Sequence, residues 1–202
     1  MLKDAGWILT KNRALEKIKD LLGSLLPAQQ ALLDEMKKPG LPEEVIAVSP
    51  KISRGENYQG LPWVILDHPR YFEKGNVFAV RTLFWWGQSF SVTLHLSGRY
   101  KAIYQQQLVR RFVSQPDEKA IGGDAHLCLC VNDKEWEHHF GKENYQPLGK
   151  MKPAARQHTL LEKPFLKLAW QIPLSQWGQP DTMENKLIRH FKSLLELLER
   201  EN

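Results

Sequence analysis

The sequence predicts an α+β fold, in which a mostly antiparallel sheet is packed by N-terminal helices and a long C-terminal helix. Three observations support this class: a β-hairpin pattern at about 77–97, helical periodicity over residues 10–38, and an amphipathic stretch after residue 180. A chain of 202 residues suits a single domain. We expect a helical segment at 1–40, a sheet-containing body at 41–178 and the C-terminal helix at 180–201.

Residues 10–38 predict two helices. Apolar residues at positions 15, 18, 21 and 22 share one face of the first helix, and Gly23 ends it. The dipeptide Pro39-Gly40 ends the second helix. A connector is then expected over residues 42–62, with a short extended piece at 45–48. A short strand should follow at 63–66 and end at Asp67-His68-Pro69-Arg70.

The hairpin is the most informative pattern in the chain. Residues 77–86 are β-branched or aromatic in most positions, apolar on both faces, and therefore predict a strand in the sheet interior. Gly87-Gln88 predicts a two-residue type II′ turn, because glycine accepts a positive φ at the first central position. In residues 89–97, apolar side chains occupy the even positions and polar ones the odd positions. One face should pack on the core, and the other should meet water or a ligand.

Weaker patterns follow the hairpin. Residues 100–113 fit a helix loosely, with a strand as the alternative, and residues 115–124 predict a loop. A strand is expected at 125–131. Asp133 is expected to cap a short helix that runs through Phe140, and residues 141–164 look irregular because prolines and glycines recur there.

The C-terminal part contains two clear elements. Residues 165–174 predict a strand, because apolar side chains alternate along it. Pro180 and Asp181 open the last helix, and Glu184 stands at capping-box spacing from Asp181. Seven apolar residues form one continuous stripe on this helix, which predicts burial in the core. They are Met183, Leu187, Ile188, Phe191, Leu194, Leu195 and Leu198.

Composition limits the class of protein. Charged residues make up 25% of the chain and apolar residues 42%, which is ordinary for a globular protein. The longest apolar run has only five residues, so no membrane span is expected, and the first residues lack the apolar core of a signal peptide. The chain has two cysteines, Cys128 and Cys130, whose spacing on one strand makes a bridge between them strained. We therefore expect a cytoplasmic location.

The formal net charge of +5 is concentrated in one region. Residues 59–114 hold seven Lys or Arg and only two Asp or Glu. Such an excess can attract phosphate groups. No sequence signature of a nucleic-acid-binding domain accompanies it, so nucleic acid is not the expected partner.

Two groups of residues have the chemistry of metal ligands. His126, Cys128 and Cys130 share one face of the strand predicted at 125–131, and thiolate with imidazole suits zinc. In the helix predicted at 133–140, Glu135 would lie beside His138 and His139. The Cys-x-Cys spacing is unlike a zinc knuckle, and a di-iron site needs a second Glu-x-x-His copy. Buried thiols and a solvated helix end are therefore the preferred interpretation, and we expect no metal or cofactor.

Polar residues near the predicted strands are candidates for a site. Asp67 and His68 at a strand end, and His95 on the polar face of the hairpin, are the candidate catalytic groups. Arg54, Tyr58 and Arg70 are the candidate ligand-binding residues, because loops held by a rigid sheet commonly carry binding sites. The alternative is that these groups satisfy polar backbone atoms. The motifs typical of nucleophilic serines, Walker A loops and dinucleotide-binding loops do not occur.

The sequence favours a non-catalytic domain that binds a small molecule or a protein. An enzyme that uses histidine and carboxylate acid-base chemistry, with or without a metal, is the first alternative. An anion or nucleic-acid binder is the second alternative. Convergence of His68, His95 and His138 on one pocket would favour the enzyme, whereas scattered histidines together with an exposed aromatic patch would favour the binding domain.

Overall fold

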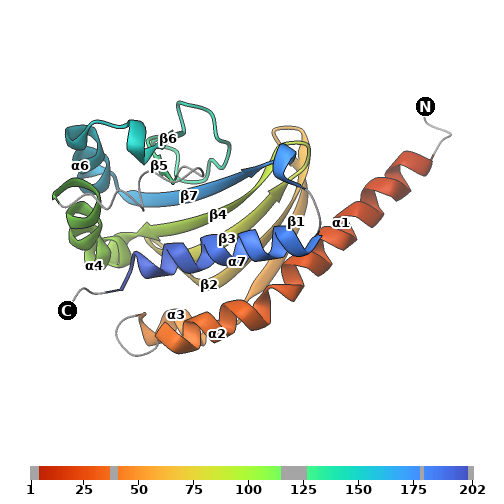
Figure 1. Cartoon of the computed structure of the whole chain (residues 1–202), viewed down its shortest axis with the longest axis horizontal. Helices are drawn as coiled ribbons and strands as arrows, with labels where there is room; N and C mark the ends of the chain where they lie inside the picture. Colours follow the sequence, from red (N-terminus) through yellow and green to blue (C-terminus); the bar gives the residue numbers. More distant parts are fainter. Residues whose placement is uncertain (1–4, 37–40, 115–126, 178–179, 200–202) are drawn as a thin grey trace.

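A computed structural model describes residues 5–36, 41–114, 127–177 and 180–199. In this part of the chain, seven strands form one antiparallel sheet in the order β1-β2-β3-β4-β7-β5-β6 (Figure 1). The strands are β1 (Lys51–Tyr58), β2 (Leu61–Glu73), β3 (Asn76–Trp85), β4 (Ser89–Ser97), β5 (Cys128–Cys130), β6 (Tyr145–Pro147) and β7 (Phe165–Pro173). The predicted α+β class with an antiparallel sheet is confirmed.

Helices cover one face and one end of this sheet (Figure 1). The α-helices are α1 (Gly6–Ser24), α2 (Leu26–Met36), α3 (Glu43–Ala47), α4 (Gly98–Val109), α6 (Pro153–Glu162) and α7 (Pro180–Glu196). Helix α7 packs across β3 and β4, α1 and α3 pack on β2, and α2 packs against α7. A short π-helical turn, Arg110–Ser114, continues α4, so the preference for helix over strand at 100–113 is confirmed.

The predicted central hairpin is confirmed as β3 and β4, which pair from Phe78↔Leu96 to Trp85↔Ser89. The even residues of β4 lie in the main core with the apolar stripe of α7, as their periodicity predicts. The prediction for the odd residues needs correction. All nine residues of β4 are buried, and the segment that follows β5 lies over the polar face, where Glu135 and Trp136 contact His95.

The turn of the hairpin is longer than predicted. Trp85 pairs with Ser89, so three residues form the loop instead of two. Gln88 N–H donates to the Trp85 carbonyl at 3.1 Å, and Gly87 takes a φ of +67°. Glycine is required there as expected, but at the third position of the turn.

Three predictions between residues 42 and 73 are wrong. Residues 45–48 do not form an extended piece, because α3 begins after Pro42 with two acidic residues in its first turn. The expected connector contains β1, an edge strand without apolar alternation. Strand β2 does not end at 67–70: a register shift between Asp67 and Arg70 lets it continue to Glu73.

Two predictions after residue 130 are also wrong. The helix expected at 133–140 does not form, and this segment is irregular because side chains of the sheet bind its backbone. The stretch 141–164, expected to be irregular, contains β6 and α6. Pro153 occupies the first turn of α6, where proline is favourable. The loop expected at 115–124 and the side chain of Asp181 lie outside the described residues.

Among the described residues, the helices are too short or too polar for any of them to cross a bilayer.

Candidate functional site

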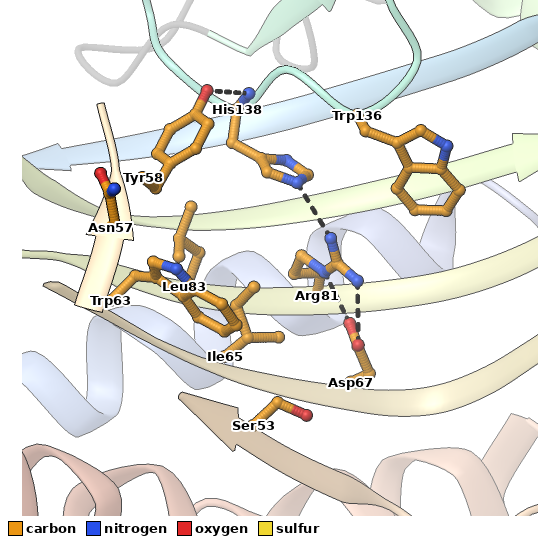
Figure 2. Close-up of a pocket in the computed structure, with 10 residues that line it drawn as sticks. All are labelled: Ser53, Asn57, Tyr58, Trp63, Ile65, Asp67, Arg81, Leu83, Trp136 and His138. Atoms are coloured by element: carbon orange, nitrogen blue, oxygen red, sulfur yellow. Dashed lines mark hydrogen bonds and ion pairs between the residues drawn. The ribbon is translucent and has the colours of Figure 1, made fainter. Parts of the chain in front are cut away.

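The site lies on the face of the sheet opposite α7. On this face, β1, β2 and β3 leave a pocket of about 340 Å³ beside the segment that carries Trp136 and His138 (Figure 2). This volume is at the lower end of the range for small-molecule sites. The pocket has an apolar end and a polar end, and the backbone alternation of two neighbouring strands produces both.

The apolar end is made by Tyr58, Trp63, Ile65 and Leu83 (Figure 2). Ile65 and Leu83 are cross-strand partners on β2 and β3, and each is less than 8% exposed. Alternate residues of a strand share a face, so residues 63, 65 and 67 all reach the pocket. The Tyr58 ring packs on Trp85 at a centroid distance of 5.0 Å, which fixes this wall.

Trp63 lies over the backbone of Gly55, its cross-strand partner on β1. A Cβ atom at position 55 would come within 2.6 Å of the Trp63 ring. The indole can therefore approach the β1 backbone this closely only because residue 55 has no side chain.

Gly55→Ala is therefore expected to push the Trp63 ring away and to lower the free energy of unfolding by about 1–3 kcal/mol. Urea unfolding and the tryptophan emission spectrum would measure both effects. Gly23→Ala is the control, because a Cβ atom in α1 would meet no atom within 4 Å. That change should stabilise the helix by about 1 kcal/mol. Equal effects of the two substitutions would refute the close approach of Trp63.

The polar end is a chain of three side chains, Asp67, Arg81 and His138 (Figure 2). Arg81 Nε and Nη2 donate to the two Asp67 carboxylate oxygens at 2.7 and 2.9 Å. Its Nη1 lies 3.0 Å from His138 Nε2. Guanidinium can only donate, so Nε2 must be the accepting nitrogen and the proton of neutral His138 sits on Nδ1.

The three side chains Asp67, Arg81 and His138 together carry little net charge. Burial, together with the nearby Arg81 charge, holds the pKa of His138 well below its usual range, so its imidazole is uncharged at pH 7. Asp67 compensates the charge of Arg81 through a bidentate ion pair. The polar end therefore presents directed donors and acceptors but little net charge.

Buried groups of the sheet hold the segment around Trp136 and His138 in place. Lys167, which is fully buried on β7, donates to the backbone carbonyls of Glu135 and Glu137 at 2.8 and 2.6 Å. His95 Nε2 lies 2.8 Å from the Glu135 carboxylate, and burial lowers the pKa of this histidine. These contacts replace the helical hydrogen bonds that the sequence predicted for the segment.

Tyr58 provides a third anchor from β1. Its hydroxyl accepts hydrogen bonds from the backbone N–H groups of His138 and His139, at 2.7 and 3.1 Å. It donates to the Glu137 carboxylate at 2.9 Å. Tyr58 thus joins the edge strand to the segment and closes one side of the pocket.

The structure separates the three candidate catalytic residues. Asp67 lines the pocket, whereas His68 does not and is buried elsewhere in β2. His95 lies behind the pocket, where its ring packs against Trp136 at 5.2 Å. Of the three histidines whose convergence would favour an enzyme, only His138 reaches the pocket.

The candidate ligand-binding residues are also separated. Tyr58 lines the pocket. Arg54 forms an ion pair with Glu16 of α1, and Arg70 donates to the Ser49 carbonyl at 2.9 Å. The two arginines therefore support the packing of neighbouring segments instead of facing the pocket.

The candidate metal ligands do not form a cluster within the described residues. Cys128 and Cys130 pack in a small core group with Tyr145 and Phe165, and burial raises the pKa of Cys128 to about 11. Buried surroundings of this kind favour the neutral thiol over the thiolate. Glu135, His138 and His139 have the separate partners described above or, for His139, a 3.2 Å bond from Gly141 N–H. His126 lies outside the described residues.

Several of the basic residues of 59–114 have structural partners. Arg81 is bound by Asp67, and Arg99 interacts with Glu44 and the Tyr100 hydroxyl. Lys101 is buried and donates to the Leu161 carbonyl at 2.8 Å. These residues therefore do not provide free cations for an anion-binding surface.

The sequence interpretation missed several pocket residues. Ser53 and Trp63 were assigned to no site, Trp136 was treated as part of a helix, and Arg81 was counted only as surface charge. One signal for Arg81 was present: a charged residue within an apolar central strand needs a partner, and Asp67 is the one acidic residue on the preceding strand before Glu73.

Comparison of the chain with protein-family models, curated proteins and solved structures gave no match.

Proposed function

We propose that this protein binds a small molecule, without transforming it, in the pocket between β1–β3 and Trp136. The observation that carries this proposal is the pre-arranged polar chain of Asp67, Arg81 and His138 at the end of an otherwise apolar cavity. Apolar walls with a few fixed polar groups are the usual composition of a ligand site.

Binding is favoured over catalysis because the titratable groups already have partners. His138 accepts a bond from Arg81, and His95 lies behind the pocket wall beside Glu135. An acid-base enzyme needs a group whose proton can be transferred to a bound substrate. Protonated His138 would place a second positive charge beside Arg81, so this residue is poorly suited to be a general base.

A small molecule is the proposed partner, and we propose a cytoplasmic location. Cys128 and Cys130 support that location, because both are buried as thiols in the core.

Filling the pocket tests the proposal. Ser53→Phe places a ring at the pocket wall, on a strand where aromatic residues are tolerated. Ligand-observed NMR with a set of flat, ring-containing fragments should detect binding to the wild type. Binding by these fragments should weaken at least tenfold in Ser53→Phe.

The matched control is Arg54→Phe, which adds a ring at the next position of β1, where the side chain contacts Glu16 instead of the pocket. Fragment binding should persist in this variant. The proposal fails if no fragment binds to the wild type, or if Ser53→Phe and Arg54→Phe bind the fragments equally well.

A further inference from the structure

We infer that the pocket selects a flat, uncharged molecule that carries a hydrogen-bond acceptor and donor side by side, as an aromatic carboxamide or a lactam does. This inference rests on the proposed function and specifies its ligand class. It follows from the charge balance at the polar end, from the hydrogen-bonding capacity left there, and from the shape of the apolar end.

Charge balance excludes a fully charged head group. The guanidinium of Arg81 is matched by the Asp67 carboxylate through two short bonds, and each of the two side chains is about one-tenth exposed. A carboxylate ligand would meet Arg81 but also the charge of Asp67. An ammonium ligand would meet the reverse conflict. Charges brought into a partly buried site lose their hydration, so neither ion gains a net attraction that offsets this loss.

Hydrogen-bonding capacity defines the head group. Arg81 has five N–H donors, of which three are used by Asp67 and His138 within the described residues. Each Asp67 oxygen accepts one bond from Arg81 and has a further lone pair. The Arg81–Asp67 pair thus offers a donor beside an acceptor. A carboxamide carbonyl can accept from Arg81 while its N–H donates to Asp67.

The shape of the pocket defines the body of the ligand. Trp63 and Tyr58 stand at the apolar end, Ile65 and Leu83 form the floor, and Trp136 stands over the polar end beside Arg81 (Figure 2). Aromatic walls around an aliphatic floor favour a flat ring, because the ring can pack on both. The rise of a strand places residues 63 and 67 roughly 13 Å apart, which allows a fused ring with one head group.

Three compounds with the same ring test the inference: 2-naphthamide, 2-naphthoate and (2-naphthyl)methylammonium, measured by isothermal titration calorimetry at pH 7.5. In the wild type, 2-naphthamide should bind at least tenfold more tightly than either ion. Asp67→Asn removes the compensating charge while keeping a side chain of the same shape. In this variant, 2-naphthoate should gain at least tenfold in affinity and should overtake the amide.

Two further variants complete the experiment. Arg54→Gln lies outside the pocket and should keep the wild-type order with all three affinities within twofold. If Asp67→Asn does not fold, as judged by circular dichroism, the double variant Asp67→Asn/Arg81→Gln replaces the ion pair by two neutral amides. This double variant should still bind 2-naphthamide in preference to both ions.

The possible outcomes separate the two proposals. An ion that binds the wild type as tightly as 2-naphthamide overturns the inference about charge and leaves the proposed binding function intact. A 2-naphthoate affinity unchanged by Asp67→Asn, or loss of amide preference in the double variant, also overturns it. If none of the three compounds binds while the flat fragments do, the ligand class is wrong. If neither set binds, the proposed function fails.

Discussion

Replacing Lys167 by methionine is expected to lower the free energy of unfolding by about 3–5 kcal/mol. Methionine has a similar length but no donor, so the carbonyls of Glu135 and Glu137 would lose their buried partner. The Lys167 ammonium also lies 5.5 Å from the Tyr145 and Phe165 ring centres, and these contacts would be lost as well. Chemical unfolding monitored by circular dichroism measures the loss.

The matched control is Lys163→Met. Lys163 also contacts the segment that carries Trp136 and His138, but through an ion pair with the exposed carboxylate of Asp133 at 2.6 Å. Such a surface pair contributes roughly 0–1 kcal/mol. If the two lysine variants lost the same stability, the buried anchor would have no special role. Because Lys167 positions Trp136 and His138, its loss should also abolish fragment binding in the folded fraction.

Acidification from pH 7 to pH 5.5 is expected to destabilise the fold by roughly 2–4 kcal/mol. Burial lowers the pKa values of His95 and His138, and burial lowers the pKa of His190 to about 4. In the unfolded chain these histidines take up a proton near pH 6.5. The unfolded state therefore binds more protons below that pH. The stabilising contribution of each histidine that stays neutral when folded is fully present above pH 6.5. Below that pH it falls by up to about 1.4 kcal/mol per pH unit.

His138→Gln separates the contribution of one histidine from the rest. Glutamine stays neutral at every pH, and its carbonyl oxygen can accept the bond that Arg81 donates to His138. Between pH 6 and pH 5, the slope of stability against pH should decrease by about 1 kcal/mol per unit. Urea unfolding at several pH values gives this slope. A wild-type stability that stays constant from pH 7 to pH 5.5 would contradict the burial of neutral histidines.

Much of the fold could be predicted because two periodicities were strong. The alternation of β4 and the continuous stripe of α7 each identify an element and its buried face. Strand β1 was missed because it lies at the sheet edge, where none of its residues is fully buried and no apolar alternation is needed. Helix α6 was missed because its prolyl start resembles the surrounding loops. Local sequence alone does not distinguish such an edge strand, or a helix that begins with proline, from a loop.

The site was predicted less completely for a different physical reason. Asp67, Tyr58 and His138 could be singled out by residue type, but what each contacts depends on strand register. Asp67 meets Arg81 because these two residues are cross-strand partners, and a shift by one residue would turn them to opposite faces. The segment at 133–140 has the composition of a helix. Its conformation depends on Lys167 and His95, which are far away in the sequence, so tertiary contacts override the local preference.

The most direct test of the binding proposal is a titration of the ¹⁵N-labelled tryptophan indoles with 2-naphthamide, followed by two-dimensional NMR. Of the seven tryptophans, Trp63 and Trp136 line the pocket, whereas Trp170 and Trp177 lie on the face covered by α7. The indole signals of Trp63 and Trp136 should shift and saturate together, while those of Trp170 and Trp177 stay in place. Saturating shifts confined to other tryptophans, or no saturating shift at Trp63 and Trp136, would contradict the account.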